Sequence, residues 1–266
     1  MQPVHLCLSH DNKRLFVTDM GNHLVQVLNK EDGTFIQTIG NGQGKGPGQF
    51  LYTPWGVCIS PDGRELYVAD QGNHRINVFN TIDGTSTRSF GQGQIKYPLD
   101  VCVSRNGEEI YVSETFNLNG GIQVLRISDG SRVRTIGNEL DQNDSTDGLC
   151  LSPDNELLFV ACGKKIEVFR TRDGAHVLSS VFDEEDGKLS GICLSPNGEE
   201  LYVTNSKFLY SQVYVLRTED GSLIRTLGDH GQNQGEFISP QGVCVSPDGE
   251  MFVADTGNYR VQVFQI

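Results

Sequence analysis

The sequence predicts an all-β protein, a six-bladed β-propeller of four-stranded antiparallel blades, and two observations support this fold class. A strand–turn–strand unit with a central cysteine recurs six times, at successive spacings of 51, 44, 48, 43 and 51 residues. Strand repeats of this length are typical of radial arrays, because one unit alone cannot bury its apolar face. The 266-residue chain also contains 31 glycines and short apolar runs, as expected for strands joined by tight turns. The six repeat cysteines are Cys7, Cys58, Cys102, Cys150, Cys193 and Cys244.

The second copy shows the four strands of one blade. Residues 56–60 form an apolar strand, and the Ser-Pro-Asp-Gly turn at 60–63 leads to a second strand at 65–69. Residues 75–80 alternate apolar and polar side chains, and residues 85–91 form a more polar outer strand. The same order in every copy predicts a single domain over residues 1–266, with blades at about 4–40, 54–91, 98–137, 146–181, 189–228 and 240–266.

The sixth copy reaches Ile266 after its third strand. We therefore expect the sixth blade to lack its outer strand in this chain. A segment upstream of Met1 in a longer parent protein is predicted to supply that strand, and a three-stranded sixth blade is the alternative.

The composition limits which binding partners and which cellular compartment we expect. A net charge of −13 opposes binding to phosphate backbones, so we do not expect RNA binding. The apolar runs have strand length, which predicts no membrane span. Symmetry-equivalent cysteines on six different blades offer no disulfide geometry, so we interpret them as packing residues. Unpaired thiols favour a reducing compartment, and we expect a cytoplasmic protein.

Three turns carry a recurring motif: Gly21-Asn22-His23-Leu24, Gly72-Asn73-His74-Arg75-Ile76 and Gly257-Asn258-Tyr259-Arg260-Val261. With the linkers at 44–50 and 231–237, these motifs resemble the NHL-repeat family over the whole chain. The third, fourth and fifth copies depart from the motif. The resemblance implies a six-bladed propeller. NHL propellers include the recognition ends of tripartite-motif ubiquitin ligases, sensor domains of bacterial kinases and a peptide-amidating lyase, and the chain is most similar to the first group.

The loops divide into two sets. Turns between strands one and two, and between three and four, are short and uniform, whereas the strand two–three loops and the blade linkers vary. Binding sites are usually built on irregular loops, so we expect a site on this variable face. Aromatic and acidic residues there are the candidate partner-binding residues: Trp55, Tyr97, Phe116, Phe208, Tyr210, Asp183, Glu184 and Glu185. The alternatives are packing between blades for the aromatic residues and an ordinary solvated face for the acidic ones.

Two patterns raise the possibility of a metal. Oxygen-bearing side chains alternate at Asp141, Asn143, Ser145 and Asp147, as at the start of a calcium loop, but the later glycine and glutamate are missing. The second strands end in a ring of mostly polar residues, which a turn capped by its own aspartate also explains. The ring comprises Asp19, Asp70, Glu114, Cys162, Asn205 and Asp255.

Among the histidines, only His5 and His230 are predicted to face a channel mouth. His5 and Asp100 replace the glycine two residues before the repeat cysteine, and the sequence alone does not explain this.

These patterns predict a non-catalytic recognition module that binds a protein or peptide on its variable face. We expect it to need no cofactor, to be monomeric as a domain and to belong to a larger protein such as a ubiquitin ligase. A metal-dependent lyase or hydrolase at the channel mouth is the first alternative. Single-stranded RNA binding is the second.

Overall fold

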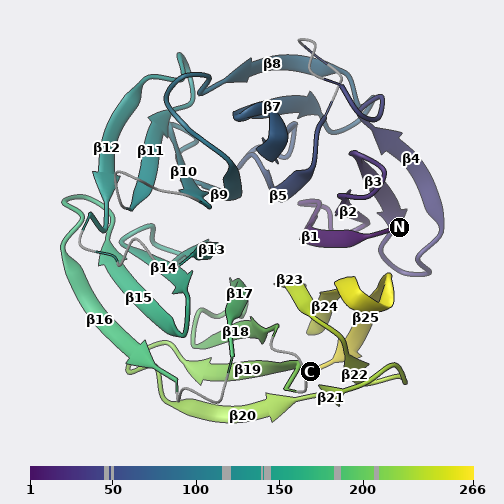
Figure 1. The fold of residues 1–266 in the computed structure, drawn as a ribbon, viewed down its shortest axis with the longest axis vertical. Coiled ribbons are helices and arrows are strands. Elements are labelled where there is room, and N and C mark those ends of the chain that lie inside the picture. The colour runs from purple at the N-terminus through teal and green to yellow at the C-terminus, as the bar shows by residue number, and fades with distance from the viewer. Residues whose placement is uncertain are drawn as a thin grey trace.

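Six β-sheets stand like blades around a central axis in this computed structural model, which describes residues 1–44, 48, 51–115, 121–138, 140, 145–182, 187–206 and 210–266 (Figure 1). The prediction of an all-β six-bladed propeller is confirmed. Each of the first five blades is a four-stranded antiparallel sheet whose strands follow one another in chain order. Within the described residues the only helices are two single 3₁₀ turns, at Gln71–Asn73 and Thr256–Asn258.

The first three blades comprise β1 (Pro3–Leu8), β2 (Arg14–Asp19), β3 (Leu24–Asn29) and β4 (Phe35–Ile39); β5 (Pro54–Ile59), β6 (Glu65–Asp70), β7 (Arg75–Asn80) and β8 (Ser86–Phe90); and β9 (Pro98–Val103), β10 (Glu109–Glu114), β11 (Ile122–Arg126) and β12 (Arg132–Ile136). The next two comprise β13 (Thr146–Leu151), β14 (Leu157–Cys162), β15 (Lys165–Arg170) and β16 (His176–Val181); and β17 (Leu189–Leu194), β18 (Glu200–Asn205), β19 (Gln212–Arg217) and β20 (Leu223–Leu227).

The sixth sheet has three strands in the described part of the chain: β23 (Pro240–Val245), β24 (Glu250–Asp255) and β25 (Arg260–Gln265). A short parallel pair, β21 (Asp229–His230) and β22 (Glu236–Phe237), lies in the linker before it. The expectation of a sixth blade without an outer strand is thus met within residues 1–266. The predicted upstream source of that strand stays a prediction.

The hydrophobic core lies between the blades rather than within one of them. The second strand of each blade is buried on both sides, which explains its consecutive apolar residues. Phe16 and Val27 of the first blade, for example, share a cluster with Val57 and Val68 of the second. Each blade therefore depends on its neighbour to bury its face, as the repeat length predicts.

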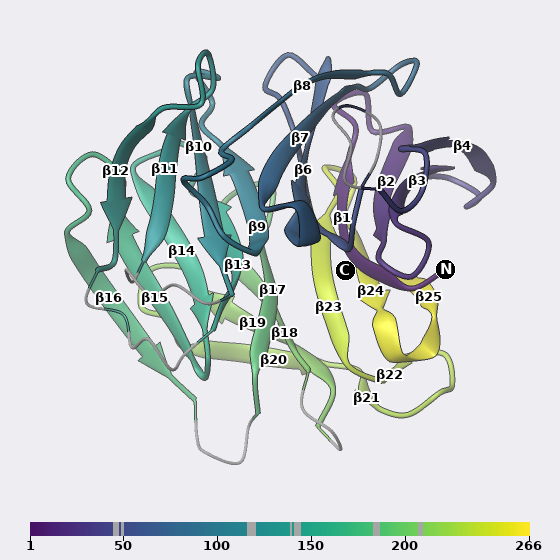
Figure 2. The ribbon, with the colours of Figure 1, turned by 45° about the horizontal axis from the view of Figure 1, so that its top comes forward.

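Apolar packing also closes the ring between the last blade and the first. Leu6 and Val17 pack with Phe252 and Ala254, and β1 lies beside β23 and β24 (Figure 2). The Thr256 hydroxyl donates a hydrogen bond of 2.6 Å to a backbone carbonyl of the first blade, that of Pro3. The ring thus closes through its inner strands.

In the first and second blades, the Asp-x-Gly-Asn-His turn contacts the backbone that enters its own blade and the linker that enters the next blade. The buried Asp70 carboxylate accepts hydrogen bonds from the Tyr52 amide, at 2.7 Å, and from Asn73. His74 Nδ1 accepts one from the Tyr97 amide, at 3.1 Å, in the linker that enters the next blade. Asp19 and Asp255 accept hydrogen bonds from Asn22 and Asn258 of their own turns, which confirms the turn interpretation of these carboxylates.

Arginine–glutamate pairs hold the outer strand in three of the blades. In the third blade, Arg134 of β12 donates two hydrogen bonds to Glu109, at 2.6 and 2.8 Å, and one to the Tyr111 hydroxyl. The second and fifth blades repeat this arrangement with Arg88 and Arg225. A bidentate pair of this kind fixes both the strand and its register.

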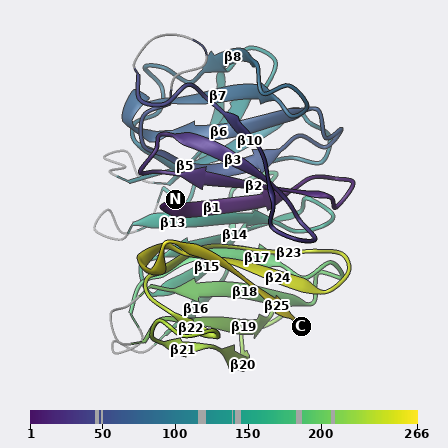
Figure 3. The ribbon, with the colours of Figure 1, turned by 90° about the vertical axis from the view of Figure 1, so that its right-hand side faces the viewer.

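The first and third strands of every blade run in the same direction. Their starts, the strand two–three loops and the blade linkers therefore lie on one face, the variable face; the other face, made of the hairpin turns, is called the turn face. Seen from the side, the N-terminus lies on the variable face and β25 ends on the turn face (Figure 3). No helix among the described residues is long and apolar enough to cross a membrane.

Candidate binding face and central cavity

Three of the predicted aromatic residues lie on the variable face. Trp55 is partly buried near the start of β5, whereas Tyr97, which precedes β9, is 42% exposed. Tyr210, which precedes β19, is 49% exposed. Trp55 and Tyr97 thus belong to neighbouring blades, and Tyr210 belongs to the fifth blade.

Tyr97 is held in place by the turn of the preceding blade. Its backbone has a positive φ of 48°, and its amide donates to His74 Nδ1. Its ring meets the His74 imidazole edge-on, with centroids 4.2 Å apart. The Tyr97 carbonyl accepts a hydrogen bond from the Thr115 amide at 3.1 Å. An exposed aromatic ring on a backbone fixed in this way is preorganised for contact with a partner.

Several predicted site residues lie outside the described part of the chain: Phe116, Phe208, Asp183, Glu184, Glu185, Asp141 and Asn143. The other two members of the calcium-like pattern are described. Ser145 donates a hydrogen bond to Asp147, and Lys188 Nζ lies 2.6 Å from Asp147 Oδ2. The carboxylate is therefore already paired with a cation. Within the described residues, no group of three or more His, Cys, Asp or Glu side chains is placed to hold a metal ion.

A cavity of 410 Å³ occupies the centre of the ring, and all six repeat cysteines line it. Each thiol packs against an apolar cluster, as the packing interpretation predicts, but five of the six are only partly buried and face the cavity. Burial raises the pKa of Cys58 and of Cys150 to about 12. These thiols are therefore protonated at neutral pH and are weak nucleophiles and metal ligands.

His5 and Asp100 meet at the variable-face end of this cavity. His5 Nε2 lies 3.4 Å from Asp100 Oδ1, although the two residues come from the first and third blades. The Asp100 carboxylate is fully buried and accepts hydrogen bonds of 2.8 Å from the amides of Val101 and Leu149. Burial raises the pKa of the Asp100 carboxyl, and the nearby His5 opposes this rise.

A glycine makes this contact possible. A Cβ added at Gly56, in the intervening second blade, would lie 2.4 Å from Asp100 Oδ1. His5 and Asp100, the two residues that replace the glycine before the repeat cysteine, thus contact each other across the axis. His230 lies in β21 and is not among the residues that line the cavity, so the structure does not bring it to His5.

From the His5 end, the cavity reaches the first turns of several blades on the turn face, at Arg105, Pro153 and Pro196. It therefore extends to the face opposite the exposed tyrosines. The sequence analysis predicts a central channel but does not identify the repeat cysteines as its lining. The recurrence of cysteine in the sequence carries this information, because one equivalent position on six inner strands must face the axis.

Comparison with known proteins gives matches to short parts of the chain. The family model described as NHL repeat matches residues 51–79 and 237–264. Human NHL repeat-containing protein 2 is 32% identical over 83 residues, which are 28% of this chain and 11% of that protein. Human tripartite motif-containing protein 2 is 42% identical over 45 residues, 17% of this chain and 6% of that protein.

The chloroplastic protein SUPPRESSOR OF QUENCHING 1 of Arabidopsis thaliana is 30% identical over 100 residues, 35% of this chain and 10% of that protein. The chain thus spans a small part of the length of these curated relatives. Among solved structures, Kuenenia stuttgartiensis hydrazine synthase superposes with a TM-score of 0.75 at 17% identity, over 99% of this chain and 76% of that one. At this identity the likeness concerns the fold alone.

Proposed function

We propose that this chain, an NHL-repeat protein, is a recognition module that binds a protein or peptide partner on its variable face. The observation that supports this proposal is the exposed aromatic ring of Tyr97, whose backbone and imidazole contact hold it in place. Trp55 on the neighbouring blade and Tyr210 across the ring extend the surface. Aromatic residues of this kind often supply most of the binding energy of an interface.

The acidic residues Asp183, Glu184 and Glu185 favour a partner peptide that carries basic side chains. They follow the fourth blade in the sequence and lie outside the described residues, and the sequence predicts them for the variable face. With a net charge of −13, the chain favours such a partner over single-stranded RNA.

The relatives support a place within a larger protein. The matches to tripartite motif-containing protein 2 and to NHL repeat-containing protein 2 each cover a small share of those proteins. We propose that the module works as the recognition part of a multidomain protein, such as a ubiquitin ligase. It acts as a monomer in this role, and its six free repeat cysteines favour the reducing cytoplasm.

The test is quantitative capture of proteins from a lysate by immobilised wild-type domain and by variants. Tyr97→Ala and Tyr210→Ala should each reduce the capture of specific partners severalfold. Ile82→Ala is the matched control, because Ile82 is a 74% exposed apolar residue in a turn of the opposite face. Equal capture by all three variants, with melting temperatures equal to wild type, would reject the variable face as the binding site. Salt-sensitive binding of RNA oligonucleotides would instead favour the nucleic-acid alternative.

A further inference from the structure

Two linkers of the variable face have backbones in an uncommon conformation. Thr53 has a φ of 50° and Tyr97 a φ of 48°, in the left-handed region that residues other than glycine rarely adopt. Each precedes a proline, Pro54 or Pro98, and the residue before a proline normally prefers an extended backbone. Conformations of this kind carry strain and persist only where neighbouring contacts hold them.

A histidine of the preceding blade supplies such a contact in both linkers. His23, which precedes β3, accepts a hydrogen bond of 3.0 Å at Nδ1 from the Thr53 amide. His74, which precedes β7, accepts one of 3.1 Å at Nδ1 from the Tyr97 amide. Because an amide nitrogen only donates, Nδ1 of each imidazole carries no proton, and the neutral ring has its proton on Nε2.

Protonation of either imidazole removes this acceptor. Both nitrogens of an imidazolium donate, so no rotation of the ring restores a hydrogen bond to the amide. Contact with the Tyr97 ring is open to both forms of His74, whereas the amide bond is open to the neutral form alone. Histidine is the side chain whose charge normally changes between about pH 5 and 8. Acid in this range should therefore release the two amides and, with them, the strained backbone.

The charged groups around His74 already have partners. In its own turn, the Asp70 carboxylate lies 2.7 Å from the guanidinium of Arg75, and both side chains are fully buried. In the next blade, Glu114 accepts a hydrogen bond from the amide of Lys96 in the linker. Neither carboxylate is therefore free to take the place of the lost amide bond.

His23 has a similar setting. Asp19 of its own turn accepts hydrogen bonds from the side chains of Asn22 and Gln26, at 2.8 and 2.7 Å. The Tyr52 ring, in the linker that enters the second blade, lies with its centroid 5.4 Å from that of the imidazole. The two junctions thus share one design, in which a neutral imidazole holds the residue before a proline.

A third linker has the same backbone but a different acceptor. Ser239 has a φ of 48° and precedes Pro240. The Ser211 hydroxyl accepts a hydrogen bond of 3.1 Å from the Ser239 amide. Ser211 lies immediately before a third strand, β19, as His23 and His74 lie before β3 and β7. A hydroxyl remains an acceptor over the whole range in which histidine titrates, so this linker is an internal control.

We propose that this pair of histidines forms a proton-sensitive switch in the variable face. The neutral imidazoles hold the linkers at Thr53 and Tyr97, and protonation releases them. The bistable element is the residue before the proline, which is left-handed when held and extended when released. Tyr97 carries the exposed ring of the proposed binding face, so the switch weakens partner binding in acid. This consequence rests on the proposed function, whereas the switch itself does not.

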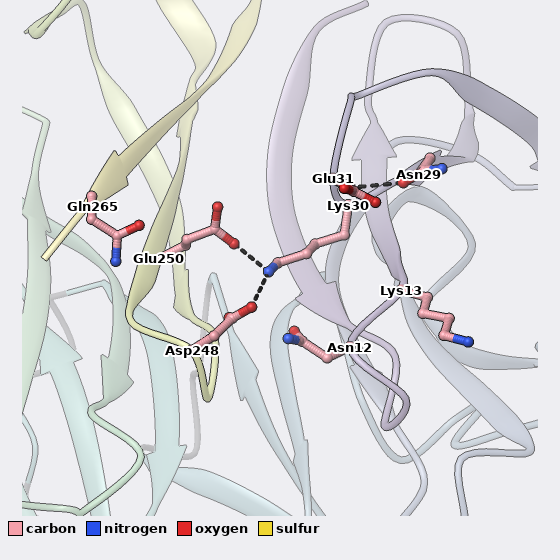
Figure 4. Close-up of a pocket in the computed structure, with 8 residues that line it drawn as sticks. All are labelled: Asn12, Lys13, Asn29, Lys30, Glu31, Asp248, Glu250 and Gln265. Atoms are coloured by element: carbon pink, nitrogen blue, oxygen red, sulfur yellow. Dashed lines mark hydrogen bonds and ion pairs between the residues drawn. The ribbon is translucent and has the colours of Figure 1, made fainter.

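Closure of the ring should not respond over the same pH range. Between the last and first blades, Lys30 pairs with Asp248 at 2.6 Å (Figure 4). The Lys30 ammonium group lowers the pKa of this carboxyl, which is about 3.9 in an ordinary aspartate. The pair therefore keeps its charges between about pH 7.5 and 5.5. We expect a change that is local to the two linkers, rather than a loosening of the whole propeller.

The test is amide exchange with solvent, followed for each residue by NMR at about pH 7.5 and about pH 5.5. Each rate is divided by that of an unfolded peptide at the same pH, so that only protection is compared. Protection of the Thr53 and Tyr97 amides should fall about tenfold on acidification, the loss expected for one hydrogen bond. Protection of the Ser239 amide should change by less than about twofold, because its acceptor does not titrate.

Asparagine substitutions make the test specific. Asparagine accepts through Oδ1 at every pH in this range and tolerates the left-handed backbone of His74, whose φ is 54°. His74→Asn should therefore remove the pH response of Tyr97 and leave that of Thr53. His176→Asn is the matched control and should leave both responses as in wild type, because His176 pairs with Glu167 within the fourth blade. Thermal melting checks that both variants are folded.

Three results would overturn the proposal. The first is equal protection of the Tyr97 amide at the two pH values. The second is an equal loss of protection at the Ser239 amide, which would indicate a general effect of acid. The third is an undiminished response of Tyr97 in the His74→Asn variant. No partner takes part in these measurements, so the switch can fail while the capture assay with Tyr97→Ala succeeds, and the reverse.

Discussion

Replacing Thr18 with valine should weaken the junction between the first and second blades. Thr18 is fully buried in β2, at a point where the inner strand β1 shifts register and leaves an amide without a strand partner. The Thr18 hydroxyl accepts a hydrogen bond of 2.9 Å from that amide, of His5, and donates one of 2.6 Å to the Trp55 carbonyl of the next blade. Valine keeps the shape of the side chain and removes both bonds.

The expected cost follows from those two bonds. Each contributes about 1 kcal/mol to the free energy of unfolding, and a buried group left without a partner costs about 1–3 kcal/mol. Alanine occupies the same position in three other blades, as Ala69, Ala161 and Ala254, so the inner strand tolerates an apolar neighbour there. We therefore expect a loss of about 2 kcal/mol, which is about 1 kcal/mol for each of the two bonds. In a protein of this size it should lower Tm by about 4–8 °C.

The assay is urea and thermal unfolding followed by the fluorescence of Trp55, the single tryptophan, whose own carbonyl takes part in the contact. Thr18→Ser keeps the hydroxyl and should restore most of the loss, since Ser113 serves this position in the third blade. Thr38→Val, at an exposed site in β4, is the control and should change the free energy of unfolding by less than about 0.5 kcal/mol. A Thr18→Val variant as stable as the control would refute the reasoning.

Three further predictions concern stability and the thiols. Gly191→Ala should lower stability by about 1–3 kcal/mol in denaturant unfolding, because its Cβ would lie 2.2 Å from the Gln241 carbonyl oxygen. Gly21→Ala should cost much less, because its Cβ would come no closer than 3.2 Å to the side chain of Gln2, and equal costs would contradict the clash. The Arg134 guanidinium lowers the pKa of Glu109, so the stability from this pair is complete above the unfolded pKa of about 4.3 and is lost as pH falls through the folded value. The midpoint of urea unfolding should therefore fall less steeply below pH 5 in Arg134→Ala than in wild type, and parallel pH profiles would argue against the pair. The repeat cysteines should react slowly with a thiol reagent at pH 8 in the folded protein, because burial raises the pKa of Cys58 and Cys150 to about 12. All seven cysteines should react after the protein is unfolded without reductant. Rapid labelling of the folded protein would contradict the thiol environment described above.

Much of the fold could be predicted because its determinants are local. A period of about fifty residues, Asp-Gly turns and alternating apolar residues predict the strands, and the structure places β6 at Glu65–Asp70, close to the expected 65–69. The turn role of Asp70 could be predicted for the same reason, since its partner Asn73 lies three residues away.

The candidate sites were harder to predict, because their partners are distant along the chain. His5 and Asp100 stood out as exceptions to a repeat, but their contact depends on the separation of two blades across the axis and on the missing side chain of Gly56. The aromatic candidates Trp55, Tyr97 and Tyr210 were assigned to the variable face from loop variability, and strand direction puts them there. Their role in binding stays a prediction, as do the roles of Phe116 and Phe208.

The sequence by itself determined the repeat, the blade order and the turns capped by their own aspartates, because these features join residues that are close in the chain or recur at one period. Only the tertiary structure decided what the closed ring brings together: the thiol-lined cavity, the His5–Asp100 contact at its end, and the ion pairs of Lys30 with Asp248 and Glu250 between the first and last blades. The physical reason is that ring closure places residues from distant blades within contact distance. Such distances depend on how all six sheets pack, and no single repeat specifies them.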